Sequence, residues 1–493
     1  METKDLSYYK NKRISGNLKK DTALISDILK KDGMLRVRKV RIGKTRFFCT
    51  LFFMDGMADG NAVLEGIVKP LIRYGAEEDF APVPSKIISD CLYAGEITET
   101  CDLSSMLDGI LYGDTLLLAD SQTSALIINT KGWKTRSIDE PPNERVLEGP
   151  REGFGESALL SVAMLRRKLR TPDFCAEPLK CGRRSGTQVY LCYLGSLADK
   201  SLVDEVKKRI DRIDIDGILD TNYISESIKD RKNSIFKTAG STERPDIAAA
   251  RLLEGRIAII SDGSPSVLTV PYLFSENFQS DDDYYMSFII GSIGRAFRIL
   301  SFIFACFLTG LYVSLVTFHA GLIPTASALA VLRLRIGVPF STLTESIILI
   351  IAFEILKEAC SRAPKDTGTA LGVVGGLVIG EAAVNTETIS APTLIIVALA
   401  GICTVMIPRL RGAVFFINLA STAASGLFGL FGLFSVLVAV LLYVLRLSSF
   451  GVDYTESLVD PSFQNLKDVL FRAPWRKMIL RPPFNKNRVR QLK

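Results

Sequence analysis

The sequence predicts a soluble α/β N-terminal half made of two lobes, followed by an all-α domain with several membrane-spanning helices. Charged residues are frequent from residue 1 to about residue 285, and no uncharged run there is long enough to cross a membrane. Three later stretches carry no ionised side chain, namely 299–332, 388–408 and 412–445. A helix needs about 20 apolar residues to cross a hydrocarbon core, and each stretch reaches that length.

The cellular compartment is predicted from the first residues and from the cysteines. The opening METKDLSYYKNKR lacks the apolar core of a secretory signal peptide, so we expect the N-terminal half to stay in the cytoplasm. The nine cysteines are odd in number and follow no repeating spacing, which is typical of a reducing compartment rather than of a disulfide framework.

We expect four parts along the chain: an N-terminal α/β lobe (1–140), a second α/β lobe (141–286), a helical membrane domain (287–450) and a basic C-terminal tail (451–493). The first boundary rests on the chain breakers Pro141, Pro142, Gly149 and Pro150. The tail has eight Lys or Arg and no acid within 472–493. Such a tail favours an anionic cytoplasmic leaflet, and a solvated tail is an equally compatible interpretation.

The first lobe contains a basic segment and a candidate hairpin. Residues 36–46 carry six bases in eleven positions and precede the apolar run 47–54. We favour a strand with one solvated basic face, and a contact with lipid headgroups or a partner is the alternative. Residues 116–130 read as two short strands around a polar turn.

The second lobe alternates helices and strands, which indicates an α/β arrangement. A helix is expected over 154–170, with acids near its start and bases near its end as the helix dipole favours. A strand is expected over 187–194 and a hairpin over 256–271. Between them, Val203, Val206, Ile210 and Ile213 recur at helical spacing.

The long apolar stretches require breaks. As one helix, 299–332 would be about 51 Å long, so we expect a span over 299–318 and a shorter helix after Gly321 and Pro324. A separate helix over 287–298 is expected to lie at the membrane interface. The stretch 412–445 is either one tilted helix or two short ones, and we expect four or six crossings in all.

Ionisable residues interrupt the membrane half at one place. The apolar segment 338–359 carries Glu345, Glu354, Lys357 and Glu358, although a charge near the bilayer centre costs about 2.5–3.5 kcal/mol. Glu354 and Glu358 share a helix face, and Glu345 lies about half a turn out of phase. We interpret Glu345, Glu354 and Glu358 as candidates for ion passage or gating, with a buried structural ion pair or an interface as the alternative.

Glycines recur every four residues in the next segment, 369–384. Gly372, Gly376 and Gly380 would present bare backbone on one helix face, which lets another helix approach closely in lipid. A dinucleotide-binding loop would need a soluble strand–turn–helix unit, so we predict helix packing. The segment is short enough to be a re-entrant helix.

Catalytic and metal-binding patterns are not expected. The single histidine, His319, excludes histidine-based zinc sites and a Ser–His–Asp triad in the soluble lobes, and we expect it to be an interfacial structural residue. Gly43-Lys44-Thr45 lacks the leading glycine of a P-loop, because Arg38 stands in its place. Cys175 and Cys181 lack paired metal-ligand spacing. We therefore expect no enzyme, no metal, no cofactor and no nucleic-acid partner.

Three blocks in fixed order resemble the GerA family of spore germination proteins, in its A-subunit branch. They are 148–170 (EGPREGFGESALLSVAMLRRKLR), 241–285 (with TERPD, LLEGRIAIISDGSPSVLTVP and FQSDDDYY) and 338–384 (with VPF, LKEA and GVVGGLVIGEAAV). The resemblance covers the chain from about residue 130 to 450, and the first 130 residues match only loosely.

The resemblance implies a receptor subunit in the inner membrane of a bacterial spore. It implies a transporter-like B subunit and a lipoprotein C subunit as partners, contact with membrane lipid, and a homo-oligomer around a central path for ions. It also implies that nutrient recognition lies mainly with the B subunit.

Some positions depart from the family pattern. Ser341 and Thr342 replace prolines, Ile350 stands where a glutamate is frequent, and Glu381 replaces a glutamine. Three other readings stay open: a related stage V sporulation protein AF channel that amplifies germination, a scaffold without a pore, and a secondary transporter. The last would predict inverted repeats, and no matching halves are visible.

Overall fold

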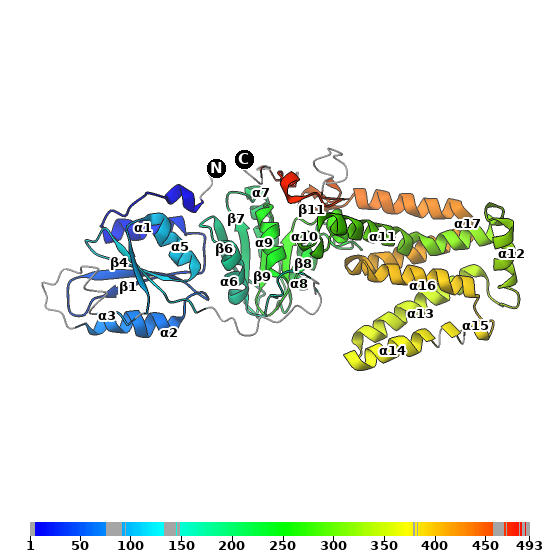
Figure 1. Ribbon diagram of the computed structural model, residues 1–493, viewed down its shortest axis with the longest axis horizontal. Helices are drawn as coiled ribbons and strands as arrows, with labels where there is room; N and C mark the ends of the chain where they lie inside the picture. The colour runs from blue at the N-terminus through cyan, green and yellow to red at the C-terminus, as the bar shows by residue number, and fades with distance from the viewer. Residues whose placement is uncertain are drawn as a thin grey trace. The chain divides into compact units, whose positions relative to one another are not determined.

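The computed structural model describes residues 5–74, 91–93, 95–132, 144, 148–377, 380–381, 383–456, 468–469, 471–482, 484–485 and 489. The chain forms two compact units. We call residues 1–232, 239–272 and 480–493 the α/β unit, and residues 233–238 and 273–479 the helical unit. The α/β fold of the first half and the helical fold of the second confirm the predicted fold class (Figure 1).

The first lobe is a five-stranded antiparallel sheet in the order β1-β2-β4-β5-β3. Its strands are β1 (Leu35–Arg41), β2 (Phe48–Met54), β3 (Ile97–Thr100), β4 (Thr115–Ala119) and β5 (Ala125–Ile128). Its helices are α1 (Leu18–Ile28), α2 (Gly60–Val63), a π turn (Leu64–Val68), α3 (Lys69–Arg73) and α5 (Leu103–Tyr112).

Both faces of this sheet are buried at its central strands β2, β4 and β5, which explains the apolar run 47–54. Successive strand residues point to opposite faces. Phe52 of β2 packs in the core with α1 and α5, whereas Leu51 packs in the core with α2 and α3. The two strands expected within 116–130 are confirmed as β4 and β5.

The second lobe is a five-stranded sheet in the order β6-β7-β9-β10-β8. Its strands are β6 (Phe174–Cys181), β7 (Thr187–Leu194), β8 (Gly240–Thr242), β9 (Ile257–Ser261) and β10 (Val267–Val270). Its helices are α6 (Ala158–Lys168), α7 (Lys200–Asp211), α8 (Thr221–Ile228) and α9 (Pro245–Leu253). The strand at 187–194 and the β9–β10 hairpin agree with the sequence prediction.

The helix expected from residue 154 begins later, at Ala158. Phe154 is held outside it, since its N–H donates to the Glu243 carbonyl at 2.7 Å. Glu152 still meets the basic end of the helix, because it pairs with Arg167 and Lys168. The expected breakers Pro141 and Pro142 lie outside the described residues.

One core runs through both lobes of the α/β unit. It includes Met54 and Leu107 of the first lobe together with Leu165 and Ile260 of the second. The ion pair between Asp32 and Arg166 crosses the same boundary, and both side chains are almost fully buried. The two lobes are therefore packed as one body.

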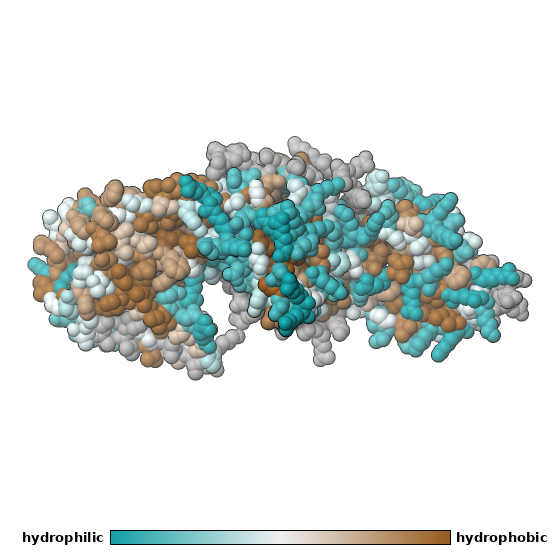
Figure 2. Space-filling model, turned by 180° about the vertical axis from the view of Figure 1, so that it is seen from behind, coloured by the Kyte–Doolittle hydropathy of each residue, from teal (hydrophilic) through white to brown (hydrophobic). Residues whose placement is uncertain are grey.

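The helical unit contains eight α-helices within the described residues. They are α11 (Phe288–Thr317), α12 (Thr325–Arg333), α13 (Thr342–Arg362), α14 (Lys365–Leu377), α15 (Ala383–Asn385), α16 (Ala391–Val405) and α17 (Arg411–Leu445), preceded by the short α10 (Asp282–Tyr285). Among the residues that the structure describes, two helical stretches are long and apolar enough to cross a membrane, Phe288–Thr317 and Pro408–Leu445. Figure 2 shows apolar side chains gathered over this unit.

The expected separate helix over 287–298 is wrong, because α11 continues through it without a break. Its two arginines do not force a boundary, since the Asp283 carboxylate accepts hydrogen bonds from Arg295 at 3.3 Å and Arg298 at 2.5 Å. Arg295 also pairs with Asp468 at 3.1 Å. The break expected near Gly321 and Pro324 is present, because α12 starts directly after that proline.

Helix α17 is interrupted at Gly429, which resolves the alternative that the sequence left open. Gly429 has φ 63° and ψ −143° inside an otherwise helical run. This conformation is essentially restricted to glycine. The stretch is therefore two helical segments that meet at Gly429, and His319 packs against the joint.

Candidate functional site

The three acids singled out from the sequence all lie on α13. Ser341 caps this helix, since its Oγ accepts a hydrogen bond from the Thr344 N–H at 3.2 Å. A hydroxyl at this position satisfies one of the donors that a helix start leaves open. The capped helix then runs without interruption to Arg362. The number of residues between the acids therefore determines where each one lies around the helix axis.

Glu345 is fully buried and fully paired. Its Oε1 accepts a hydrogen bond from Arg335 Nη2 at 3.2 Å, and its Oε2 accepts one from Ser390 Oγ at 2.8 Å. Ser390 Oγ also lies 2.7 Å from Thr393 Oγ1, which lies 3.3 Å from the Tyr312 hydroxyl. This chain of polar groups links α11, α13 and α16 around a buried carboxylate.

Glu354 lies on the other side of α13, between two bases. Lys357 Nζ is 2.9 Å from its Oε2, and Arg411 Nη2 is 3.0 Å from its Oε1. Arg411 belongs to α17, so this ion pair ties α13 to α17. The Glu354 side chain is 26% exposed.

Glu358 is the most exposed of the three acids. Arg362 Nε is 2.6 Å from its Oε1, and Arg411 Nη2 is 3.7 Å from its Oε2. One arginine therefore reaches both Glu354 and Glu358, as their four-residue spacing allows. The structure brings these two acids together and leaves Glu345 apart from them.

A small cavity adjoins Glu354. Its volume is about 20 Å³, and polar groups of Glu354, Lys357, Thr404 and Asn418 line it among apolar side chains from α13, α16 and α17. A space of this size holds about one water molecule.

The glycine-rich segment forms α14, which packs against α13. A Cβ at Gly375 would lie 2.6 Å from Leu356 Cδ1, and one at Gly368 would lie 2.8 Å from the Cys360 carbonyl oxygen. A Cβ at Gly372 would lie 3.6 Å from Cys360 Sγ, an ordinary contact, and no described atom lies within 4 Å of a Cβ at Gly376 or Gly380. Within one chain, α14 therefore approaches α13 closely at Gly368 and Gly375. The packing role of the three predicted glycines, Gly372, Gly376 and Gly380, stays a prediction.

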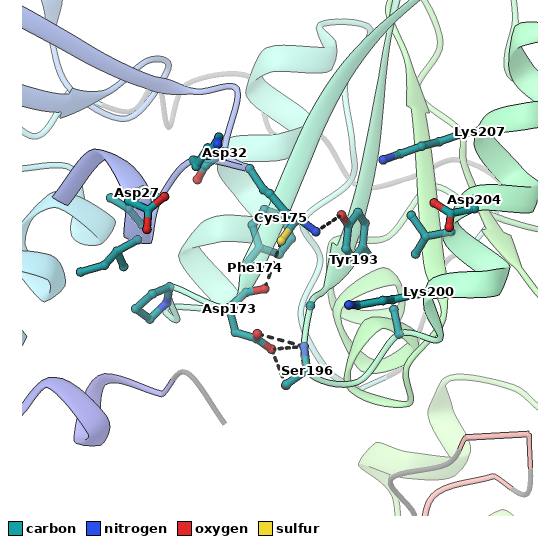
Figure 3. A pocket seen from close by; sticks show the side chains of 18 residues that line it. Asp27, Asp32, Asp173, Phe174, Cys175, Tyr193, Ser196, Lys200, Asp204 and Lys207 are labelled. Carbon is teal, nitrogen blue, oxygen red and sulfur yellow. Dashed lines mark hydrogen bonds between the residues drawn. The ribbon is translucent and has the colours of Figure 1, made fainter. Parts of the chain in front are cut away.

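A larger cavity, which the sequence did not indicate, lies between the two lobes of the α/β unit (Figure 3). Its volume is about 530 Å³, within the range of small-molecule sites. Bases and acids both line it, and these are Lys31, Lys200, Lys207, Asp27, Asp32, Asp173 and Asp204. A lining with both signs of charge suits a small polar molecule better than an apolar one.

Hydrogen bonds fix several side chains around this cavity. The Asp173 carboxylate accepts hydrogen bonds from the Ser196 N–H at 3.0 Å and from its hydroxyl at 2.5 Å. The Tyr193 hydroxyl donates to Glu177, and Lys207 pairs with the same carboxylate at 2.5 Å. Lys31 Nζ donates to the Tyr193 hydroxyl at 3.4 Å.

These contacts shift the acidity of the groups involved. Burial acts to raise the pKa of Glu177, but the hydrogen bonds from Lys207 and Tyr193 outweigh it and bring that pKa below its usual value. Burial and the hydrogen bond to Glu177 raise the pKa of Tyr193, and burial raises the pKa of the Cys175 thiol. Tyr193 and Cys175 therefore stay neutral at physiological pH.

No signal in the sequence could have identified this cavity. Its walls come from two segments, 27–32 and 172–207, that only the packing of the two lobes brings together. Cys175, considered above as a metal ligand, is one of its lining residues. Over the described part of the chain, no group of three or more His, Cys, Asp or Glu side chains could hold a metal ion.

Comparison with known proteins identifies the family. The sequence profile of the family described as "Bacillus/Clostridium GerA spore germination protein" matches residues 23–484. Spore germination protein KA of Bacillus subtilis is 35% identical over 93% of this chain and 83% of its own length. Spore germination protein GerLA of Bacillus cereus is 33% identical over 96% of both chains. Spore germination protein A1 of Bacillus subtilis is 33% identical over 92% of this chain and 93% of its own.

A solved structure is also similar to part of the chain. It is the N-terminal domain of the A subunit of the Bacillus megaterium spore germinant receptor GerK3, which is 28% identical, with a TM-score of 0.42, over 53% of this chain and 97% of that one. The match of the family profile over nearly the whole chain confirms the resemblance found in three sequence blocks. The chain belongs to the GerA family of spore germination proteins.

Proposed function

We propose that this chain is the A-type subunit of a spore germination receptor and takes part in nutrient-triggered ion release as an oligomeric ion channel in the inner membrane of the spore. Its partners would be further copies of itself, a transporter-like B subunit, a lipoprotein C subunit and membrane lipid. The α/β unit would face the cytoplasm, and the ion path would run through the helical unit.

One observation carries this proposal. Glu345 and Glu354, two acids of a single helix, lie buried or half-buried among α11, α16 and α17, where ionised groups are costly in a membrane protein. Such groups usually mark a path for ions or the contacts that control it. Glu354 has a cavity of about one water beside it, so it is the better candidate for contact with ions. Glu345 is the better candidate for holding the helices in place.

The proposal is tested by ion flux. Vesicles holding the full chain with its B and C subunits are loaded with potassium and exposed to a mixture of the twenty amino acids and glucose. We expect the mixture to trigger potassium efflux, and we expect Glu354→Gln to change both its rate and the preference for cations over anions. The matched control is Glu226→Gln on the surface of α8, which should behave as the wild type.

Glu345→Gln is expected to act differently from Glu354→Gln. It leaves Arg335 without its buried partner, so it should lower the melting temperature as well as alter flux. If Glu345→Gln and Glu354→Gln both leave conductance and ion preference unchanged, the chain does not form the ion path.

A further inference from the structure

The charges around Glu354 do not favour a cation in this structure. The single carboxylate is bound on one oxygen by Lys357 and on the other by Arg411, at 2.9 and 3.0 Å. Arg411 Nε adds a second hydrogen bond to Oε1 at 3.2 Å. Both oxygens of the Glu354 carboxylate are thus bound by bases, so this group is not available to attract a mobile cation from the adjacent cavity.

Arg411 is the member of this cluster that can be withdrawn. Lys357 lies three residues from Glu354 on the same helix and moves with it. Arg411 is the first residue of α17, so any movement of α17 against α13 separates it from Glu354. Its guanidinium also lies 3.7 Å from the Glu358 carboxylate. Arg411 of α17 therefore contacts two acids of α13.

The start of α17 is also tied to the chain that enters the helical unit. Arg409, two residues before Arg411, donates from Nη1 to the carbonyl oxygens of Glu276 at 3.1 Å and Gln279 at 3.4 Å. These carbonyls belong to the end of η3 (Phe274–Phe278) and the residue after it. In the chain, η3 follows β10, the last strand of the second lobe, after a short connection.

From these contacts we infer that Arg411 keeps the ion path shut and sets its charge preference by neutralising Glu354, and that Arg409 positions Arg411 by tying the start of α17 to η3. This inference rests on the proposed channel function. In the closed arrangement, Glu354 is covered by Arg411. When the start of α17 moves with η3, Arg411 leaves, and Glu354 becomes able to attract a cation.

The test compares basal leak with ion preference in the same vesicles without nutrient. Removing the positive charge in Arg411→Gln should raise basal potassium efflux about tenfold, in line with usual coupling between sites. The reversal potential under a potassium chloride gradient should shift toward that of potassium. Lys357→Gln should shift the reversal potential in the same direction, because it removes the other charge on Glu354.

Arg409→Gln should separate the two effects. This variant lets Arg411 leave Glu354 more often, so basal efflux should rise. It leaves both charges of the cluster in place, so the ion preference of the open path should equal that of the nutrient-triggered wild type. A residue with only a structural role would not raise efflux while leaving the preference unchanged.

Two variants serve as controls. Arg446→Gln makes the same chemical change at the exposed C-cap of α17, outside the Glu354 cluster, so basal efflux should match the wild type. Arg411→Lys keeps the positive charge, so it should stay largely closed without nutrient and should not shift the reversal potential. If Arg411→Gln folds poorly, Arg411→Lys and Lys357→Gln still test the role of charge.

The outcomes separate this inference from the channel proposal. If nutrient triggers efflux in the wild type but Arg411→Gln and Lys357→Gln keep its basal leak and ion preference, the inference is overturned and the channel remains. If the wild type shows no efflux under any condition, the channel proposal itself fails, and the inference fails with it.

Discussion

Charged side chains are buried in both units, and several of them form ion pairs with one another. Arg166 with Asp32, Arg295 with Asp283 and Arg335 with Glu345 are the clearest examples. A buried pair gains little over an apolar pair of the same size, but losing one partner leaves an uncompensated charge. At the residue scale, these pairs therefore add little to the stability of the fold. Their main effect is to determine which segments of the chain pack together.

The pair between the two lobes gives a direct prediction. Asp32→Asn removes the negative charge from Arg166 in a fully buried place, so we expect a loss of about 3–5 kcal/mol in the free energy of unfolding of the α/β unit. Denaturant unfolding of the full chain in detergent, followed by circular dichroism, measures it.

Asp55→Asn is the matched control for that substitution. Asp55 pairs with Arg36 at 2.8 Å, with both side chains well exposed, so its loss should cost less than about 1 kcal/mol. Equal losses for the two variants would show that the buried pair does not hold the lobes together.

The partners of these charges explain why the site could be predicted only in part. The spacing of Glu354 and Glu358 placed them on one helix face, and the intervals did set Glu345 apart. Arg335 and Arg411, however, reach those acids from other elements. Nothing in a single sequence says which arginine meets which acid, since the pairing depends on how the helices pack.

Among the elements, several strands and the break before α12 were predictable, whereas the continuity of α11 was not. The β4–β5 pair and the β9–β10 hairpin carry their pattern in consecutive residues. The sequence predicted a boundary inside α11, because Arg295 and Arg298 lie just before the stretch without charges. Asp283, which precedes α11 in the chain, pairs with both arginines. The helix can therefore continue through them.

Helix α17 gives the prediction at the element scale. Gly429 has a positive φ, and a Cβ there would lie 2.8 Å from His319 Cε1 and 3.2 Å from Phe318 Cβ. We therefore expect Gly429→Ala to destabilise the helical unit by about 1–3 kcal/mol, measured as a lower melting temperature of the full chain in detergent.

Gly412→Ala tests whether the joint, rather than glycine in general, is responsible. Gly412 lies in the same helix without a positive φ, and no described atom lies within 4 Å of an added Cβ. Alanine favours a helix over glycine, so this variant should be neutral or slightly more stable. A neutral Gly429→Ala would show that the joint does not depend on glycine.

At the scale of the whole molecule, the helical unit leaves large apolar side chains exposed (Figure 2). Along α17 they include Phe416, Phe428, Phe431 and Phe434. Lipid or further copies of the chain can cover such surface. Beside Glu354, one copy offers room for about one water molecule, which is too little for a continuous ion path. In the oligomeric channel proposed above, the ion path would therefore lie between copies.

The native mass of the full chain, extracted in mild detergent and measured with its lipid, tests this requirement most directly. A closed ring of several copies is the predicted result, with cross-links between cysteines introduced on α13 and α17 of neighbouring copies. A chain that stays strictly monomeric in native mass, and forms no such cross-links in the membrane, would contradict the proposed channel.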